Sequence, residues 1–248
     1  MRRFVIPLLI SLAPVQAIAN DDNLSMSITT DYVSEYVFRG VTLAGDAIQP
    51  GVSVTYDDFT VGVWGSVPTG NEAEAFPDEI NIYAFKEWGF GDSIDLRLGG
   101  TIFHYPESGD LFEFDNDLAN TIEGFIGIDF DLPLNPGATG YYDVDLERFT
   151  LELDFGHVFT VADLFYVEPG LTLGISDAND NLDYHWATSF LEMGVDVSKS
   201  ASVYARASYS NSSADTFADT SFDLSDPDTL DLPDTNTTWF GVGLAARF

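Results

Sequence analysis

The sequence predicts an all-β protein, a transmembrane antiparallel β-barrel of about 12 strands with up-and-down topology. Three observations support this prediction. Apolar and polar residues alternate along most of the chain. The segments between the alternating runs are by turns short and long, as they are in outer-membrane barrels. The last run ends on an aromatic residue, Phe248, with small residues and one arginine on its other face.

The N-terminus predicts export, from a bacterium, with residues 1–19 as a signal peptide and residues 20–248 as one barrel domain. Arg2 and Arg3 precede an apolar run, and Ala17-Ile18-Ala19 has the form of a cleavage site. A membrane anchor is the weaker interpretation, because the run is too short to cross about 30 Å of hydrocarbon.

The alternating runs define the strands, each near the roughly 9–11 residues that a tilted strand needs to cross a membrane. Clear examples are LSMSITTDY from residue 24, AIQPGVSVTY from 47, SIDLRLGGTIF from 93, RFTLELDFG from 148 and ASVYARASY from 201. The predicted strands cover about 24–39, 47–57, 58–66, 78–88, 93–104, 119–130, 137–145, 147–158, 163–175, 184–197, 200–210 and 236–248.

The connections predict which end of the barrel faces which side of the membrane. The short set, expected in the periplasm, is 57–58, 89–92, 131–137, 160–163 and 198–200. The long and acidic set, expected outside, is 40–46, 67–77, 105–118, 176–183 and 211–235. Only the tight turn near Asp145 departs from this alternation.

Aromatic residues on the apolar faces favour a membrane barrel over a soluble β-sandwich, which would also alternate. They gather at strand ends, as two interfacial girdles would. The outer girdle is expected to hold Tyr36, Phe38, Phe149 and Phe240; the inner one is expected to hold Tyr56, Phe59, Trp88, Phe130, Phe165 and Phe248. A terminal aromatic such as Phe248 resembles the signal that the bacterial barrel-assembly machinery reads.

Charge and composition limit the partners. The net charge of −32 argues against nucleic acid as a ligand. The chain has no cysteine, and a fold with its own closure does not need disulfides. The expected partners are outer-membrane lipids and lipopolysaccharide, the assembly machinery and a small solute.

The polar faces, projected inward, predict a charged lumen with more acids than arginines. The expected pore-lining residues are Glu35, Arg39, Glu79, Asp95, Arg97, Glu123, Glu152, Asp154, Glu168, Glu192 and Arg206. The same parity points Asp31, Asp129, Asp196, Arg148 and Arg247 inward. We expect Arg39 and Arg97 to set a constriction in a narrow, cation-preferring channel for cationic or neutral solutes. The alternative is a polar network that plugs the barrel and leaves function to the acidic outer loops.

The stretch YVFRGVT, 36–42, resembles the early motif of the TorF-type porin family of proteobacterial conserved hypothetical proteins. Later stretches match in order: GVWGS from 62, EINIY from 79, FHYP from 103, Glu123, and YYDVD from 141 before Glu152. Asn81 and Val67 depart from the pattern. The resemblance implies an outer-membrane channel and implies no particular solute.

Catalysis and metal binding have less support in the sequence than a channel has. An interfacial lipid-modifying enzyme would need a Ser and His site, and no spacing forces His104, His157 or His185 next to a serine. By parity all three histidines face lipid. The acidic loops at 177–183 and 223–234 lack the ligands of a calcium loop, although they could bind divalent cations loosely. We therefore predict no catalytic site, no metal site and no cofactor.

Overall fold

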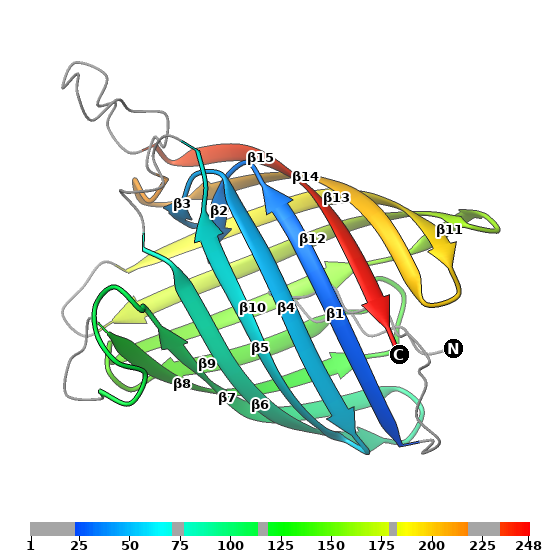
Figure 1. The fold of residues 1–248 in the computed structure, drawn as a ribbon, viewed down its shortest axis with the longest axis horizontal. Coiled ribbons are helices and arrows are strands. Elements are labelled where there is room, and N and C mark those ends of the chain that lie inside the picture. The colour runs from blue at the N-terminus through cyan, green and yellow to red at the C-terminus, as the bar shows by residue number, and fades with distance from the viewer. Residues whose placement is uncertain (1–22, 71–76, 114–118, 179–182, 218–233) are drawn as a thin grey trace.

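A closed barrel of antiparallel strands forms the whole described molecule. The computed structural model describes residues 23–70, 77–113, 119–178, 183–217 and 234–248. Its twelve barrel strands are β1 (Leu24–Val33), β4 (Ala47–Tyr56), β5 (Phe59–Pro68), β6 (Glu79–Phe90), β7 (Ile94–His104), β8 (Asn120–Phe130), β9 (Gly137–Asp143), β10 (Arg148–Gly156), β12 (Phe165–Ala178), β13 (Tyr184–Ser198), β14 (Ala201–Ser212) and β15 (Asn236–Arg247). Each pairs with the next along the chain, and β1 pairs with β15 to close the barrel (Figure 1). The predicted fold and strand number are confirmed.

The two faces of each strand follow the predicted parity. On β15, Phe240, Val242 and Leu244 are 61%, 53% and 42% exposed, whereas Ala245 and Arg247 are 5% and 4% exposed. Because inward residues are covered by the lumen contents and outward ones are not, the apolar face is the outer face. A continuous outer belt of this kind is the lipid-facing surface of a membrane barrel. In the described part of the chain, no helix is long and apolar enough to cross a membrane.

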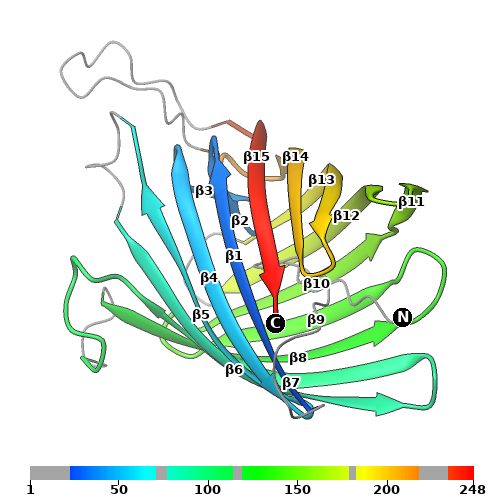
Figure 2. The same ribbon diagram turned by 45° about the vertical axis from the view of Figure 1, so that its right-hand side comes forward.

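The two ends of the barrel also differ as predicted. The end of the last strand lies beside the start of the first, since the backbone N–H of Met26 donates to the carbonyl of Phe248 at 2.8 Å. The short connections lie at this end of the barrel (Figures 1 and 2). Exposed aromatics mark both rims, with Tyr56 and Phe59 at this end and Phe149 and Phe240 at the other.

The predicted first strand is wrong beyond Val33. Residues 36–44 form a separate hairpin of β2 (Tyr36–Phe38) and β3 (Val41–Ala44), which folds into the barrel. Its turn is Arg39-Gly40, whose φ angles of 49° and 73° are both positive, as a two-residue type I′ turn requires. Figure 2 shows this hairpin inside the rim formed by β1, β15 and β14.

Tyr36 and Phe38 therefore do not belong to the outer girdle. The Tyr36 side chain is 6% exposed, and the Phe38 ring lies 5.9 Å from the ring of inward-facing Phe103. The connection predicted at 40–46 is likewise part of the lumen. The reason is the turn at Arg39-Gly40, which reverses the chain after three residues and carries both aromatics away from lipid.

A smaller correction concerns the predicted turn at 160–163. Phe159–Ala162 is a short strand, β11, which pairs with the first residues of β12 and leaves Asp163-Leu164 as the turn. Residues 1–19, predicted as the signal peptide, and parts of the loops predicted at 67–77, 105–118, 176–183 and 211–235 lie outside the described residues.

Accessibility to a thiol reagent tests the orientation of the barrel. The chain has no cysteine, so single cysteines at Ser213 and Ser200 can be compared directly. We expect an impermeant maleimide to label Ser213→Cys in intact cells and to leave Ser200→Cys unlabelled until the cells are lysed. Equal labelling of both positions before lysis would contradict the proposed orientation.

Candidate pore and its inner hairpin

Aromatic rings lie flat against the inner wall because glycines face them across the strand pairs. Several rings have a glycine as their direct partner in register, among them Tyr83 with Gly62, Tyr166 with Gly194, Trp186 with Gly174, Phe190 with Gly170, and Tyr204 with Gly243. A Cβ atom at any of these glycines would collide with the ring opposite it. These pairs place large side chains inside the barrel without filling its centre.

One side of the lumen is filled by aromatic packing. Ring centroids are 6.3 Å apart for Phe85 and Phe125, 6.0 Å for Phe125 and Tyr141, and 5.5 Å for Tyr36 and Trp64. These residues belong to β5, β6, β8 and β9 and to the inner hairpin. This ring packing narrows the lumen on one side, and Tyr36 and Trp64 at its edge also line the cavity described below.

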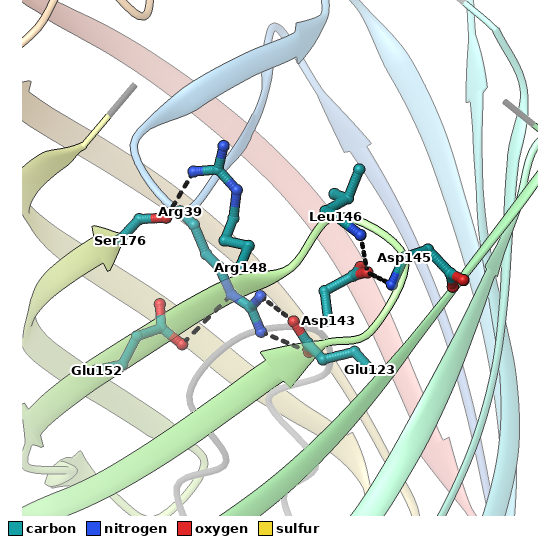
Figure 3. Close-up of polar contacts among 8 residues, drawn as sticks. All are labelled: Arg39, Glu123, Asp143, Asp145, Leu146, Arg148, Glu152 and Ser176. Carbon is teal, nitrogen blue, oxygen red and sulfur yellow. Dashed lines mark hydrogen bonds and ion pairs between the residues drawn. The ribbon is translucent and has the colours of Figure 1, made fainter. Parts of the chain in front are cut away.

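Arg39, at the tip of the hairpin, fixes the hairpin to the wall (Figure 3). Its two terminal nitrogens donate to the two oxygens of Glu123 on β8, at 2.5 and 2.9 Å. Its Nε lies 3.9 Å from an oxygen of Glu152 on β10, and its guanidinium lies 3.9 Å above the centre of the Tyr141 ring. A planar guanidinium suits this combination of a bidentate ion pair and a stacked ring.

Further bonds fix the rest of the hairpin. The Tyr36 hydroxyl lies 3.3 Å from an oxygen of Glu79 on β6, which also accepts from Asn81 at 2.7 Å. At the opposite side of the barrel, the Thr216 hydroxyl donates to the Gly40 carbonyl at 2.5 Å. The hairpin thus bridges the lumen from β6 and β8 to the segment that follows β14.

A cavity of about 210 Å³ remains between the hairpin and the barrel wall, which is formed there mainly by β10, β12, β13, β14, β15 and β1, with Gln49 of β4 and Trp64 of β5. Of the predicted pore residues, the following line it: Glu35, Arg39, Glu152, Asp154, Glu168 and Arg206. Asp31 lines it as well. The cavity therefore has five carboxylates and two guanidiniums on its surface.

The other predicted residues face inward but are buried beside this cavity and do not line it: Glu79, Asp95, Arg97, Glu123 and Glu192. Glu79 and Glu123 hold the hairpin. Arg97 donates to Asp129 at 2.8 Å, and Glu192 accepts from Arg206 at 2.7 and 3.0 Å. The structure thus brings Arg39 together with Glu123 and Glu152, and it places Arg97 in a different cluster.

Several residues of this site were missed from the sequence. The inward aromatics share the parity of the charges, and alternation alone does not distinguish them from aromatics that face lipid. Glu87 also faces inward, directly opposite Arg97 in register, at the periplasmic end of β6. A glycine facing an aromatic position on the next strand is the signal that could have identified the rings.

Two of the histidines pack against other residues. His104 is 7% exposed, with Nδ1 2.9 Å from Asn120 Oδ1, so the prediction that it faces lipid is wrong. His157 packs edge-on against Phe159, at 4.7 Å between ring centroids. Among the described residues, no group of three or more His, Cys, Asp or Glu side chains could hold a metal ion.

The sequence matches one protein family, whose function is unknown. Residues 19–131 match a family described as "Bacterial protein of unknown function (Gcw_chp)". None of the curated proteins matches the chain. The narrower resemblance to TorF-type porins stays a prediction.

Two solved structures have the same fold at 10% sequence identity. The KdgM porin superposes with a TM-score of 0.56, covering 90% of this chain and 99% of its own. The NanC porin superposes with a TM-score of 0.55, covering 89% of this chain and 98% of its own. The chain therefore has the fold of an outer-membrane β-barrel.

Proposed function

We propose that the protein is a narrow channel for small cationic or neutral solutes across the outer membrane. The route follows the cavity between the inner hairpin and the wall of β12 to β15. The hairpin forms the constriction. The resemblance to TorF-type porins supports a channel of this kind, as does a barrel fold shared with porins.

The acidic surface of the cavity is the observation on which this proposal depends. Asp31, Glu35, Glu152, Asp154 and Glu168 line the cavity together with only two guanidiniums, those of Arg39 and Arg206. Both guanidiniums are already paired, with Glu123 and Glu192, which lie outside the cavity lining. The cavity is therefore negative overall, and a negative pore attracts cations, as rings of acidic residues do in cation channels.

The geometry changes the roles proposed for individual residues. Arg97 lies beside Asp129 and does not line the cavity, so we assign the constriction to the hairpin with Arg39. Glu79 and Glu123 act as anchors of the hairpin rather than as the selective charges. KdgM has been seen in complex with disordered oligogalacturonate, which is anionic, and the acidic cavity here argues for a solute of the opposite charge.

A plugged barrel is the second candidate, because the hairpin bonds to opposite walls of the lumen. In that case function would belong to the acidic outer loops, of which residues 218–233 lie outside the described part of the chain. An interfacial lipid-modifying enzyme has no comparable support.

Reversal potential in planar bilayers tests the channel and its selectivity. We expect the wild type to conduct and to prefer K⁺ over Cl⁻ under a KCl gradient. Replacing both Glu35 and Glu168 by glutamine removes two cavity charges with little change of shape, so the reversal potential should move toward zero.

Asp57→Asn is the matched control, because Asp57 is exposed in the β4–β5 turn, outside the cavity, and asparagine tolerates its positive φ. It should leave the reversal potential unchanged. A wild type without conductance would favour the plugged barrel. A conducting double variant with unchanged selectivity would contradict the proposed role of the cavity carboxylates.

A further inference from the structure

Asp154 presents an unsatisfied carboxylate oxygen in the cavity. The residue lies on β10 and is 4% exposed. Its Oδ1 accepts a hydrogen bond from the Thr172 hydroxyl at 2.6 Å, whereas Oδ2 has no hydrogen-bond partner among the described residues. A buried carboxylate oxygen without a donor is costly, and such groups in native proteins usually have a partner. The site therefore calls for a donor that the described residues do not supply.

Glu152 lies two residues before Asp154 on the same inward face of β10. Its side chain is fully buried, and within the described residues neither of its carboxylate oxygens has a hydrogen bond of ordinary geometry, although the Tyr141 hydroxyl is a nearby donor. The Arg39 guanidinium approaches it at 3.9 Å, but the hydrogen bonds of that guanidinium go to Glu123. The positive charge of Arg39 is thus divided between Glu123 and Glu152, which leaves room for a second cation beside Asp154.

The rest of the cavity lining suits an organic cation. Trp186 and Trp239 line it from β13 and β15, and the Phe190 ring in the same lining already stacks with the Arg206 guanidinium at 4.4 Å. Aromatic faces attract cations whose water has been removed, which is a common way to recognise organic ammonium and guanidinium groups. A Mg²⁺ or Ca²⁺ ion would need about six or more oxygen ligands, and no metal-binding group is found among the described residues.

The volume limits the size of the ligand. At about 30 Å³ for each water in the liquid, a cavity of about 210 Å³ holds the equivalent of about seven waters. That is enough for a planar cation of a few heavy atoms with part of its hydration. It is too small for a peptide or an oligosaccharide.

We propose that Asp154 and Glu152 form a binding site for a small organic cation with several N–H donors, of the guanidinium or amine type. The ligand donates to Asp154 Oδ2 and to Glu152, and its apolar faces lie against the aromatic lining. This inference rests on the proposed function for access to the cavity. It adds that the channel binds its solute before releasing it, and it names the chemical class of that solute.

Guanidinium and urea provide the test, because they have nearly the same planar shape and differ in charge. Trp64, Trp186 and Trp239 line the cavity, so tryptophan fluorescence of the folded barrel in detergent reports binding without any need for conduction. We expect millimolar guanidinium chloride to give a saturable change. Urea and NaCl at the same concentrations should not give it.

Substitutions of the two carboxylates test whether guanidinium binds at Asp154 and Glu152. Asp154→Asn should weaken guanidinium binding by about tenfold or more, since it removes a charge-assisted hydrogen bond. Glu152→Gln is the second variant, for use if Asp154→Asn fails to fold, which the loss of heat-modifiable gel mobility would show. Asp57→Asn should bind as the wild type does.

The outcomes separate this inference from the proposed channel. Equal responses to urea and guanidinium, or wild-type affinity in the folded Asp154→Asn or Glu152→Gln variant, would overturn the site. Selective guanidinium binding by a barrel that does not conduct would support the binding site and contradict the channel. Cation-selective conductance without guanidinium binding would contradict the binding site and support the channel.

Discussion

Replacing Arg39 by alanine should raise the single-channel conductance, because it releases the hairpin from the wall. The substitution removes a bidentate ion pair and leaves Glu123 and Glu152, which are 4% and 0% exposed, without their cation. Removing one partner of a buried pair costs about 3–5 kcal/mol. That cost acts on the hairpin rather than on the barrel, whose strands are paired all round without it.

The matched control is Arg148→Ala. Arg148 also faces the lumen, but it donates to Ser176 at 2.7 Å on the neighbouring barrel strand and does not hold the hairpin. We expect its conductance to stay near that of the wild type. A shorter chain in which residues 36–44 are replaced by a few glycines and serines should conduct at least as well as Arg39→Ala. If neither change raises conductance, the hairpin is not the constriction.

An arginine at Leu191 should prevent or severely weaken folding into a bilayer. Leu191 is central in β13, faces outward and is 45% exposed. An arginine near the bilayer midplane of a barrel costs about 2–4 kcal/mol. Urea unfolding in lipid vesicles, followed by tryptophan emission, would measure the loss of stability.

Thr188→Arg on the same strand is the control, because Thr188 faces the cavity. Its guanidinium can stay hydrated and lies among carboxylates, so this variant should fold with a much smaller loss. Equal losses at both positions would show that the assignment of faces in β13 is wrong.

The strands could be predicted because a membrane barrel leaves each of them two contrasting environments. Lipid tolerates few polar groups and the lumen tolerates many, so alternation such as that from Phe240 to Arg247 survives along the whole chain. The tight turns could be predicted for a related reason, since antiparallel neighbours need only a few residues between them.

The inner hairpin could not be predicted by the same reasoning. Tyr36 and Phe38 continue the even-numbered apolar parity of Leu24 and Ile28, so alternation alone extends β1 through them. The chain leaves β1 after Val33 because residues 36–44 turn back at Arg39-Gly40 and bond to Glu79 and Glu123 on the barrel wall. Apolar runs on both sides of Arg39-Gly40 were the available sign of a hairpin, although asparagine or aspartate is commoner than arginine before the glycine.

The sequence predicts which charged residues face the lumen, but it does not predict which of them bond to one another. Parity shows that Arg39, Glu123, Glu152 and Asp154 face inward. It does not show that a hairpin carries Arg39 to Glu123, 84 residues further along the chain. The open oxygen of Asp154 depends on which donors reach it, and only the three-dimensional arrangement decides that.

The position of the hairpin in the chain has a consequence for assembly. The hairpin precedes every strand that anchors it: Glu123 lies 84 residues after Arg39, and Thr216 lies 176 residues after Gly40. Contacts between such distant residues form late, because the intervening chain must be ordered first. We therefore expect the hairpin to dock only after β8 and the segment that follows β14 are in place, so that the lumen is wider before docking than after it.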